Sequence, residues 1–351
     1  MALILWGLGI LVGVVLLYLV VVTFGPGFEV PRLSLHGAEQ PGSGAGPDAG
    51  TRAGRSDVSF EVRGCRISAW LYLPQSDAAP VPCIVMVHGL GGTKDILLQS
   101  YAIRFQEAGY AVLTFDHRHM GDSEGEPRQL IWMPRQLEDV VAAIAFARGL
   151  ERIDPERIAL WGTSAGGGHV VVAAARDQTV ACVVAQVPGT DGRAAGEMFL
   201  RRVGAAFAFR MLVHGQRDMM RYRLGLAPHR IPLVGQPGSV ALMADSGAVD
   251  FFRRVAPASF VNEACARVVL RASMYRPVEH AKDVRCPVLL QLAESDSLVP
   301  VSAVEETANR LGQLAEVRRY PIGHFDIYHG DNFERAVSDQ LVFFRKHLSR
   351  D

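Results

Sequence analysis

The sequence predicts an α/β protein whose eight-stranded, mostly parallel sheet follows a single N-terminal transmembrane helix. Three observations predict this class. An uncharged apolar run covers residues 2–24. Two segments of alternating hydrophobicity, at residues 58–62 and 67–73, are typical of half-buried antiparallel strands. From residue 83 onward, short apolar segments alternate with helical ones, as in βαβ units.

The N-terminal run is long enough to cross a membrane. As a helix, its 23 residues would span about 34 Å, and a hydrocarbon core is about 30 Å thick. A cleaved signal peptide is the alternative, but no Lys or Arg precedes the run and no small-x-small cleavage site follows it. We therefore expect an uncleaved anchor over residues 1–27.

Three weaker expectations concern this anchor and its surroundings. Residues 28–56 are dominated by Gly, Ala and Pro over most of their length, which predicts a flexible linker. The nearest basic residue, Arg32, lies on the C-terminal side of the anchor, so the positive-inside rule places the rest of the chain in the cytoplasm. Gly9 and Gly13 form a GxxxG pair that would allow two anchors to pack as a homodimer.

The rest of the chain supplies the elements of one α/β core over residues 57–191 and 278–351. Further strands are expected at 83–87, 111–115, 157–161, 180–187, 288–292 and 316–320. Helices are expected at 97–108, 136–148 and 165–176, from about 303 and from about 333. The first of these strands is apolar throughout, which predicts a strand covered on both faces.

One segment interrupts this alternation. Residues 192–277 contain no clear strand and have a helical and irregular pattern. Because they follow the sixth strand, we expect them to form a helical cap over the carboxyl ends of the strands, where open α/β sheets bind their ligands. The alternative is a peripheral helical insertion away from that edge.

Composition excludes some functions. Lys plus Arg and Asp plus Glu both number 36, so the formal net charge is zero, and no field of one sign attracts nucleic acid. The five cysteines form no CxxC pair and have no metal-ligand spacing. They are expected to be free thiols, most of them buried in strands, and no metal or cofactor is predicted.

Ser164 is the strongest candidate for a catalytic residue. It lies in the sequence GTSAG at residues 162–166, after an apolar strand and before an Ala/Val-rich helix. This strand-turn-helix setting is that of a nucleophile elbow, which exposes the serine hydroxyl on a sharp turn. The neighbouring residues must be small for such a turn to form, and they are.

A serine hydroxyl needs a base to remove its proton. The histidines considered are His88, His117, His119, His169 and His324. His324 is expected to be the base, because it follows the last strand and completes the chain order serine, acid, histidine. His169, on the helix that the serine opens, is expected to be a packed helix residue.

The acid that orients this histidine is expected to be Asp296, in the loop after the strand at residues 288–292. Glu294 competes with it but would still lie at the strand end. Asp326, two residues beyond the histidine, is expected to start a helix or to stabilise a loop instead.

Two backbone amides are needed to bind the oxyanion. One should come from Ala165, directly after the nucleophile. The other should come from the glycine-rich loop HGLGG at residues 88–92, where we expect Leu90, with Gly91 as the alternative. A simple tight turn is the other interpretation of this loop.

With these residues in order, residues 57–349 resemble the α/β-hydrolase superfamily. More narrowly, they resemble its dienelactone-hydrolase-like branch, which includes polyketide transferases. The resemblance rests on HGLGGTK at 88–94, FDHR at 115–118, GDSEG at 121–125, WGTSAGGGH at 161–169 and GHFDIY at 323–328. It implies the α/β-hydrolase fold and a serine triad. The long cap insertion and the membrane anchor are departures from a minimal dienelactone hydrolase, which uses a cysteine nucleophile.

The expected function is hydrolysis of a carboxylic ester, with an apolar small-molecule substrate, through an acyl-serine intermediate. A thioesterase or acyltransferase would use the same triad with another leaving group or acceptor. A non-catalytic membrane-tethered binding module is the alternative from another class, and an intact serine, acid and histidine in the required order argue against it.

Overall fold

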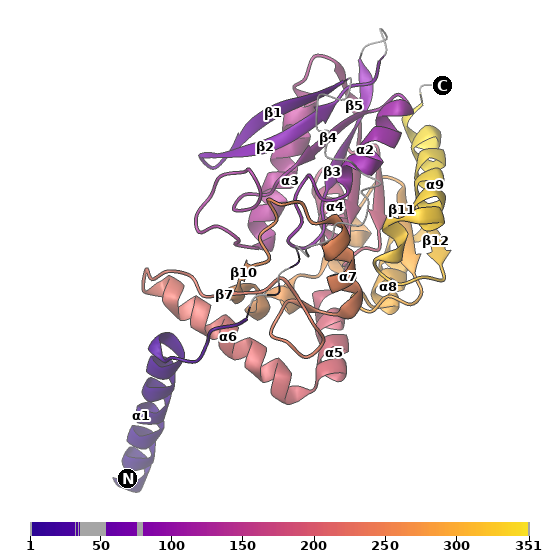
Figure 1. The fold of residues 1–351 in the computed structure, drawn as a ribbon. Coiled ribbons are helices and arrows are strands. Elements are labelled where there is room, and N and C mark those ends of the chain that lie inside the picture. Colours follow the sequence, from indigo (N-terminus) through magenta and orange to yellow (C-terminus); the bar gives the residue numbers. More distant parts are fainter. Residues whose placement is uncertain (1, 32, 34, 36–53, 76–79, 350–351) are drawn as a thin grey trace.

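The computed structural model describes residues 2–31, 33, 35, 54–75 and 80–349, and Figure 1 shows their arrangement. Eight strands form one sheet in the order β1-β2-β4-β3-β5-β6-β11-β12. Their bounds are β1 Arg55–Val62, β2 Cys65–Tyr72, β3 Val81–Val87, β4 Ala111–Phe115, β5 Ile153–Thr163, β6 Cys182–Gln186, β11 Val288–Ala293 and β12 Ala315–Tyr320. Strand β2 pairs antiparallel with β1 and β4, and the other pairings are parallel. The predicted eight-stranded, mostly parallel α/β-hydrolase sheet is confirmed.

Helices cover both faces of this sheet because the buried strands are apolar on both sides. In β3, Cys83, Val85 and Val87 pack in one core with residues of α3 (Met133–Arg148), α4 (Ala165–Arg176) and α8 (Val301–Leu311). Ile84 and Met86 point to the opposite core, which contains residues of α2 (Leu98–Glu107) and α9 (Gly330–Leu348). Successive side chains of β3 thus pack alternately against the helices on one face of the sheet and those on the other.

The insertion between β6 and β11 lies against the loops at the carboxyl end of the sheet. Its helices are α5 (Gly192–Val203), α6 (Ala205–Arg223) and α7 (Ser246–Val255), followed by the 3₁₀ segments Ala266–Leu270, Ala272–Met274 and Pro277–Asp283. Phe251 and Phe252 of α7 share a hydrophobic core with Ile96, Met120 and Ile131 from loops of the α/β core. The insertion therefore covers these loops, and we call it the cap.

The cap also contains strands that its sequence does not reveal. They are β7 (Arg230–Ile231), β8 (Val234–Gly235), β9 (Met243–Ala244) and β10 (Ala264–Cys265), which pair as β7 with β10 and β8 with β9. The expectation of no clear strand missed them, because two residues are too few for an alternating pattern to be seen.

The N-terminal helix α1 (Ala2–Phe24) projects from the molecule beside α6 (Figure 1). Residues Trp6–Phe24 have a mean hydropathy of 2.7, and the helix has the length and composition of a membrane anchor or a signal sequence. Beyond it, residues at the start of the predicted linker contact the cap: Phe28 packs on cap histidines, and Leu35 is buried in the core that Phe251 and Phe252 share. Residues 36–53 of that linker lie outside the described residues.

The five cysteines are free thiols, as expected. Four of them are buried, and Cys65 is partly exposed. Burial raises the pKa of the Cys83 thiol to about 12, so this group stays neutral and packs as an apolar side chain.

Candidate active site

Ser164 lies on a sharp turn between β5 and α4. Its backbone has φ 53° and ψ −122°, a left-handed conformation that costs a non-glycine residue about 1–3 kcal/mol. Two hydrogen bonds hold it there. The Ser164 amide donates to the carbonyl of Gln186 at 2.9 Å, and the Gly189 amide donates to the carbonyl of Ser164 at 2.8 Å. The end of β6 and the loop that follows it therefore support the strained turn.

The glycines around this serine allow backbone segments to approach one another closely. A Cβ atom on Gly162 would lie 2.3 Å from the carbonyl oxygen of Gly166. A Cβ atom on Gly166 would lie 2.3 Å from the carbonyl oxygen of Val87. Neither distance is compatible with a side chain, so both glycines of the GTSAG sequence are required by packing.

His324 and Asp296 meet this serine from two loops. The Nδ1 atom of His324 lies 2.6 Å from Oδ2 of Asp296, and its Nε2 atom lies 3.2 Å from Oγ of Ser164. The side chains of His324 and Asp296 are only 2% and 3% exposed. Because a carboxylate only accepts, Nδ1 carries the proton, which leaves the lone pair of Nε2 for the serine hydroxyl.

The carboxylate of Asp296 is itself oriented by its loop. Its Oδ1 atom accepts hydrogen bonds from the amides of Leu298 at 2.8 Å and Val299 at 2.7 Å. With Oδ1 occupied in this way, Oδ2 is directed at the imidazole of His324. The two competing acids lie elsewhere. Glu294 is exposed, with a carboxylate oxygen 4.0 Å from the Arg319 guanidinium.

Asp326 stabilises the loop of the histidine. Its Oδ2 atom accepts from the amide of Gly323 at 2.9 Å, and the residue begins a short 3₁₀ segment, Asp326–Tyr328. The structure therefore brings Ser164, His324 and Asp296 together and leaves Asp326 in the loop position that its sequence context predicts.

The other histidines considered are held in packed positions. His169 contacts the Tyr275 hydroxyl through Nδ1 at 2.6 Å and the side-chain oxygen of Gln136 through Nε2 at 3.1 Å. Burial lowers the pKa of His169 and of His117 well below the usual range. The rings of His88 and His117 are 4.8 Å apart. These side chains are neutral parts of the interior beneath the site.

The glycine-rich loop after β3 runs beside the serine. A Cβ atom on Gly89 would lie 3.2 Å from Cβ of Ser164. The loop is tightened where the amide of Gly92 donates to the carbonyl of Gly89 at 3.1 Å, and Gly91 has φ 68°. On the other side of Ser164, Ala165 begins α4, where the first amides of a helix have no intrahelical acceptor. That Leu90 and Ala165 donate to an oxyanion stays a prediction.

A pocket of about 50 Å³ opens on Ser164 and His324. The core contributes Ile96, Leu97, Leu98, Tyr101, Trp161, Thr163 and Tyr328 to its wall, and the cap contributes Met243, Phe251 and Phe252. The pocket is therefore small, and its wall is mostly apolar. Sequence reasoning named none of the cap residues, although two adjacent phenylalanines in an amphipathic segment are a signal for such a wall.

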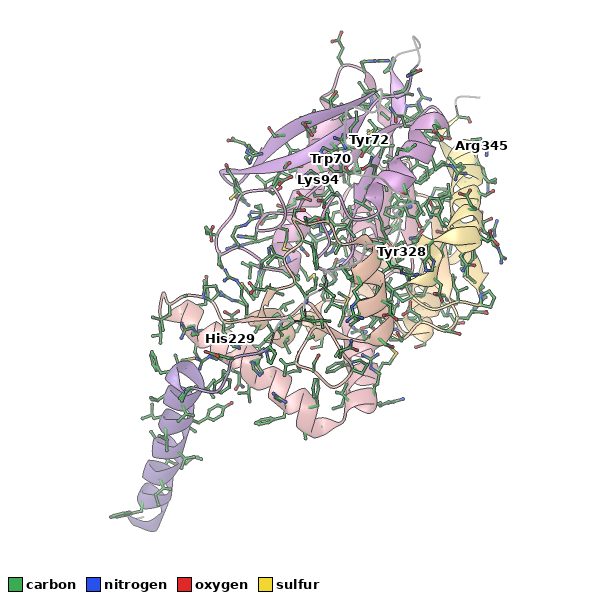
Figure 2. The ribbon with its side chains drawn as sticks, viewed as in Figure 1. Trp70, Tyr72, Lys94, His229, Tyr328 and Arg345 are labelled. Atoms are coloured by element: carbon green, nitrogen blue, oxygen red, sulfur yellow. The ribbon has the colours of Figure 1, made fainter. Side chains whose placement is uncertain are left out.

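Tyr328, the last residue of the GHFDIY sequence, is a further residue to which the sequence assigned no role. Its hydroxyl lies 2.5 Å from that of Thr163, the residue before the serine, and its ring is 5.2 Å from Phe251 of the cap. Figure 2 shows Tyr328 where the cap meets the C-terminal part of the sheet. Gln186 donates to Thr163 at 3.2 Å, so the serine turn rests on a buried polar network.

Among the residues that the structure describes, no group of three or more His, Cys, Asp or Glu side chains is arranged to hold a metal ion.

Comparison with known sequences identifies relatives over most of the chain. Residues 63–217 match the family described as X-Pro dipeptidyl-peptidase (S15 family). The chain is 39% identical over 292 residues to the quorum-quenching protein AidA of Acinetobacter baumannii (strain MDR-ZJ06). The matched region covers 83% of this chain and 94% of the relative. It is 38% identical over 309 residues to the polyketide transferase ATR5 of Stachybotrys chlorohalonatus, covering 84% of this chain and 98% of the relative.

Solved structures share its fold. The alpha/beta hydrolase GrgF from Penicillium sp. sh18 superposes with a TM-score of 0.72 at 24% identity, over 84% of this chain and 99% of that one. Est1E from Butyrivibrio proteoclasticus, solved with ferulic acid, gives a TM-score of 0.57 at 17% identity, over 84% of this chain and 100% of that one.

Proposed function

The chain belongs to the α/β-hydrolase superfamily, in its S15 and dienelactone-hydrolase-like family, and from this premise we propose that it cleaves carboxylic esters through an acyl-serine intermediate. The observation that carries the proposal is the hydrogen-bonded series from Asp296 through His324 to Ser164. This series ends at an apolar pocket, which is where an ester's acyl or alkyl group would bind.

In the first half of the reaction, Ser164 Oγ attacks the ester carbonyl carbon while Nε2 of His324 takes the hydroxyl proton. Asp296 stabilises the imidazolium that forms, through Nδ1. The tetrahedral oxyanion receives hydrogen bonds from the amides of Leu90 and Ala165, which would be worth about 3 kcal/mol for one donor. The protonated histidine then gives its proton to the leaving alkoxy oxygen, which departs as an alcohol.

In the second half, water replaces the alcohol. His324 Nε2 removes a proton from that water, and its oxygen attacks the carbonyl carbon of the acyl-serine. Collapse of the second tetrahedral intermediate breaks the bond to Ser164 Oγ, which recovers its proton from His324. The products are a carboxylic acid and the free enzyme, and no cofactor enters the balance.

The pocket supports a short acyl group. The cavity of about 50 Å³ is closed on one side by the cap side chains Met243, Phe251 and Phe252, which leave little room for a long chain. We therefore propose that acetyl and butyryl esters react faster than esters of long fatty acids in a chain-length series.

The experiment that tests the proposal combines labelling and turnover. The full-length chain should react with a fluorophosphonate probe and hydrolyse p-nitrophenyl butyrate, and Ser164→Ala should do neither. Ser338→Ala, at an exposed position on α9, is the matched control and should behave as the wild type. Labelling of Ser164→Ala at the wild-type level would contradict the assignment of the nucleophile.

Acyl transfer or thioester hydrolysis is the second candidate. It is favoured by relatives that are named as a polyketide transferase and as a thiohydrolase, the latter 39% identical over 134 residues. The same residues would act, but the leaving group would be a thiol. Paired oxoester and thioester substrates with one acyl group, with and without an added alcohol acceptor, separate these activities.

We further propose that α1 remains on the chain as a membrane anchor, with the catalytic part on the cytoplasmic side. The end of this helix is held by the cap. Arg217 Nη1 donates to the carbonyl of Val22 at 2.7 Å, and Val22 and Thr23 are buried. Cleavage of a signal peptide after residue 24 would remove Val22 and Thr23, so the Arg217 guanidinium would lose this acceptor. N-terminal sequencing of the membrane-bound protein should begin at residue 1 or 2, and a mature N-terminus beyond residue 24 would contradict the anchor.

A further inference from the structure

The corner between α5 and α6 exposes apolar side chains beside the anchor. Leu200 at the end of α5 is 46% exposed, and Phe209 and Leu212 of α6 are 62% and 42% exposed. Figure 1 shows this corner at the same end of the molecule as α1, opposite the β1 edge of the sheet. We call Leu200, Phe209 and Leu212 the corner patch.

The same face of α6 that carries the patch also contacts the anchor. The Tyr18 hydroxyl of α1 donates to the side-chain oxygen of Gln216. Positions 209, 212 and 216 are spaced i, i+3 and i+7, so they lie along one side of the helix. The patch is therefore the continuation of an existing interface with α1, displaced by one to two turns along α6.

Further contacts fix the distance between the patch and the end of the anchor. The guanidinium groups of Arg217 and Arg221 bind the carbonyls of Val22 and Thr23 at 2.7 and 3.3 Å. The Arg217 guanidinium also lies 4.6 Å from the ring centre of Phe28. In Figure 2, His229 marks this junction, and its ring is 6.4 Å from that of Phe28. The end of α1 and the start of the following segment are thus held against the cap.

The charged residues of α5 and α6 are mostly basic. Residues 192–223 contain seven arginines and two acidic residues, although the whole chain has no net charge. One of the two acids, Asp218, is buried and paired with Arg267 at 2.6 Å. Arg201, Arg210 and Arg223 are exposed. A basic helix with an apolar face is typical of segments that lie in the interface of an anionic bilayer.

From this geometry we propose that the α5–α6 corner lies in the headgroup layer of an anionic bilayer. Phe209, Leu212 and Leu200 reach into the acyl boundary, and the surrounding arginines contact lipid phosphates. This inference rests on the proposal that α1 stays on the chain and spans the membrane. It adds that the cap, not only the anchor, faces the lipid surface, which would hold the pocket close to substrates that partition into the bilayer.

The test places one nitroxide label at a time on the full-length chain, reconstituted in nanodiscs that contain phosphatidylglycerol. Cysteine is introduced in a Cys65→Ser background as Phe209→Cys, as Val12→Cys within α1, and as Val342→Cys on α9, where the native side chain is 57% exposed. Power-saturation electron paramagnetic resonance then compares collisions with oxygen, which concentrates in lipid, and with a water-soluble nickel chelate.

The label at position 209 should collide with oxygen at least threefold more than with nickel, relative to the label at position 342. Replacing Arg201, Arg210 and Arg223 together by Gln should move the ratio at position 209 toward that of position 342. A label at 209 that is as accessible to nickel as the one at 342 overturns the proposal. A label at 209 shielded from both reagents also overturns it, because a protein partner or a second copy would then cover the patch. The label at position 12 reports the anchor separately, so a failed anchor is distinguished from a misplaced corner.

Discussion

Replacing Asp296 by asparagine should reverse the hydrogen bonding of His324 and so prevent it from accepting the serine proton. Oδ1 of Asp296 accepts from two backbone amides, those of Leu298 and Val299. In Asp296→Asn, the side-chain oxygen must stay there, because turning the amide would place an NH₂ group against two donors. The NH₂ group then faces Nδ1 of His324. Nδ1 must become an acceptor, and the ring proton moves to Nε2, which faces Ser164.

The size of the effect follows from this forced tautomer. In a serine protease triad, the same change lowers kcat by about 10⁴, which corresponds to about 5.4 kcal/mol of transition-state stabilisation. We expect a loss of this order, because Nε2 of His324 lies 3.2 Å from Oγ of Ser164 and is the atom that accepts the serine proton in the mechanism. Stability should change little, because both backbone hydrogen bonds remain.

The assay is steady-state hydrolysis of p-nitrophenyl butyrate by the full-length protein, with melting temperature measured in parallel. Asp296→Asn should reduce kcat by about 10⁴ with an unchanged melting temperature. Glu294→Gln is the matched control, since this exposed carboxylate lies two residues away, and its kcat should stay within about threefold of the wild type. A kcat for Asp296→Asn within tenfold of the wild type, or a larger loss in Glu294→Gln, would refute the reasoning.

Three further predictions concern packing around the site. Gly166→Ala should lower the free energy of unfolding, measured by urea titration, by at least 1–3 kcal/mol, about the cost of overpacking. The reason is that its Cβ would lie 2.3 and 2.5 Å from the carbonyl oxygens of Val87 and His88. Gly149→Ala, where the nearest oxygen is 3.5 Å away, is the control and should be near neutral. Met243→Ala should widen the pocket and shift the acyl chain-length optimum to longer esters, and an unchanged optimum would remove this residue from the acyl site. Tyr328→Phe should destabilise the protein by about 1 kcal/mol through loss of its bond to Thr163, whereas a tenfold fall in kcat at unchanged stability would give the hydroxyl a chemical role.

The fold and the position of the candidate nucleophile could be predicted from sequence because their signals are local. The whole strand-turn-helix unit lies within 24 consecutive residues, Ile153–Arg176. It consists of the apolar end of β5, the GTSAG turn and an Ala/Val-rich helix. The close approach of Gly162 to Gly166 is part of the same unit. Periodicity likewise predicts the strands of the sheet, because burial on both faces leaves a continuous apolar run.

The choice among nearby acids could be argued but not decided in this way. Glu294 and Asp296 are two residues apart, and only the path of the loop after β11 determines which carboxylate turns inward. In the structure the amides of Leu298 and Val299 bind Asp296, and Glu294 faces solvent. Such a loop conformation depends on its neighbours in space, for which a single sequence contains no periodic signal.

Tertiary structure alone decided what surrounds the serine. Met243, Phe251 and Phe252 line the pocket although they lie about 80 residues beyond Ser164 in the chain, and Tyr328 reaches Thr163 across a separation of 165 residues. Phe28 and Leu35, which lie at the start of the segment predicted to be a flexible linker, pack against the cap. The sequence by itself determines local conformation and which faces of the strands and helices are buried. Contacts between distant segments depend on how the cap, the anchor and the sheet pack together, because the spacing of residues along the chain does not show which side chains fit against one another.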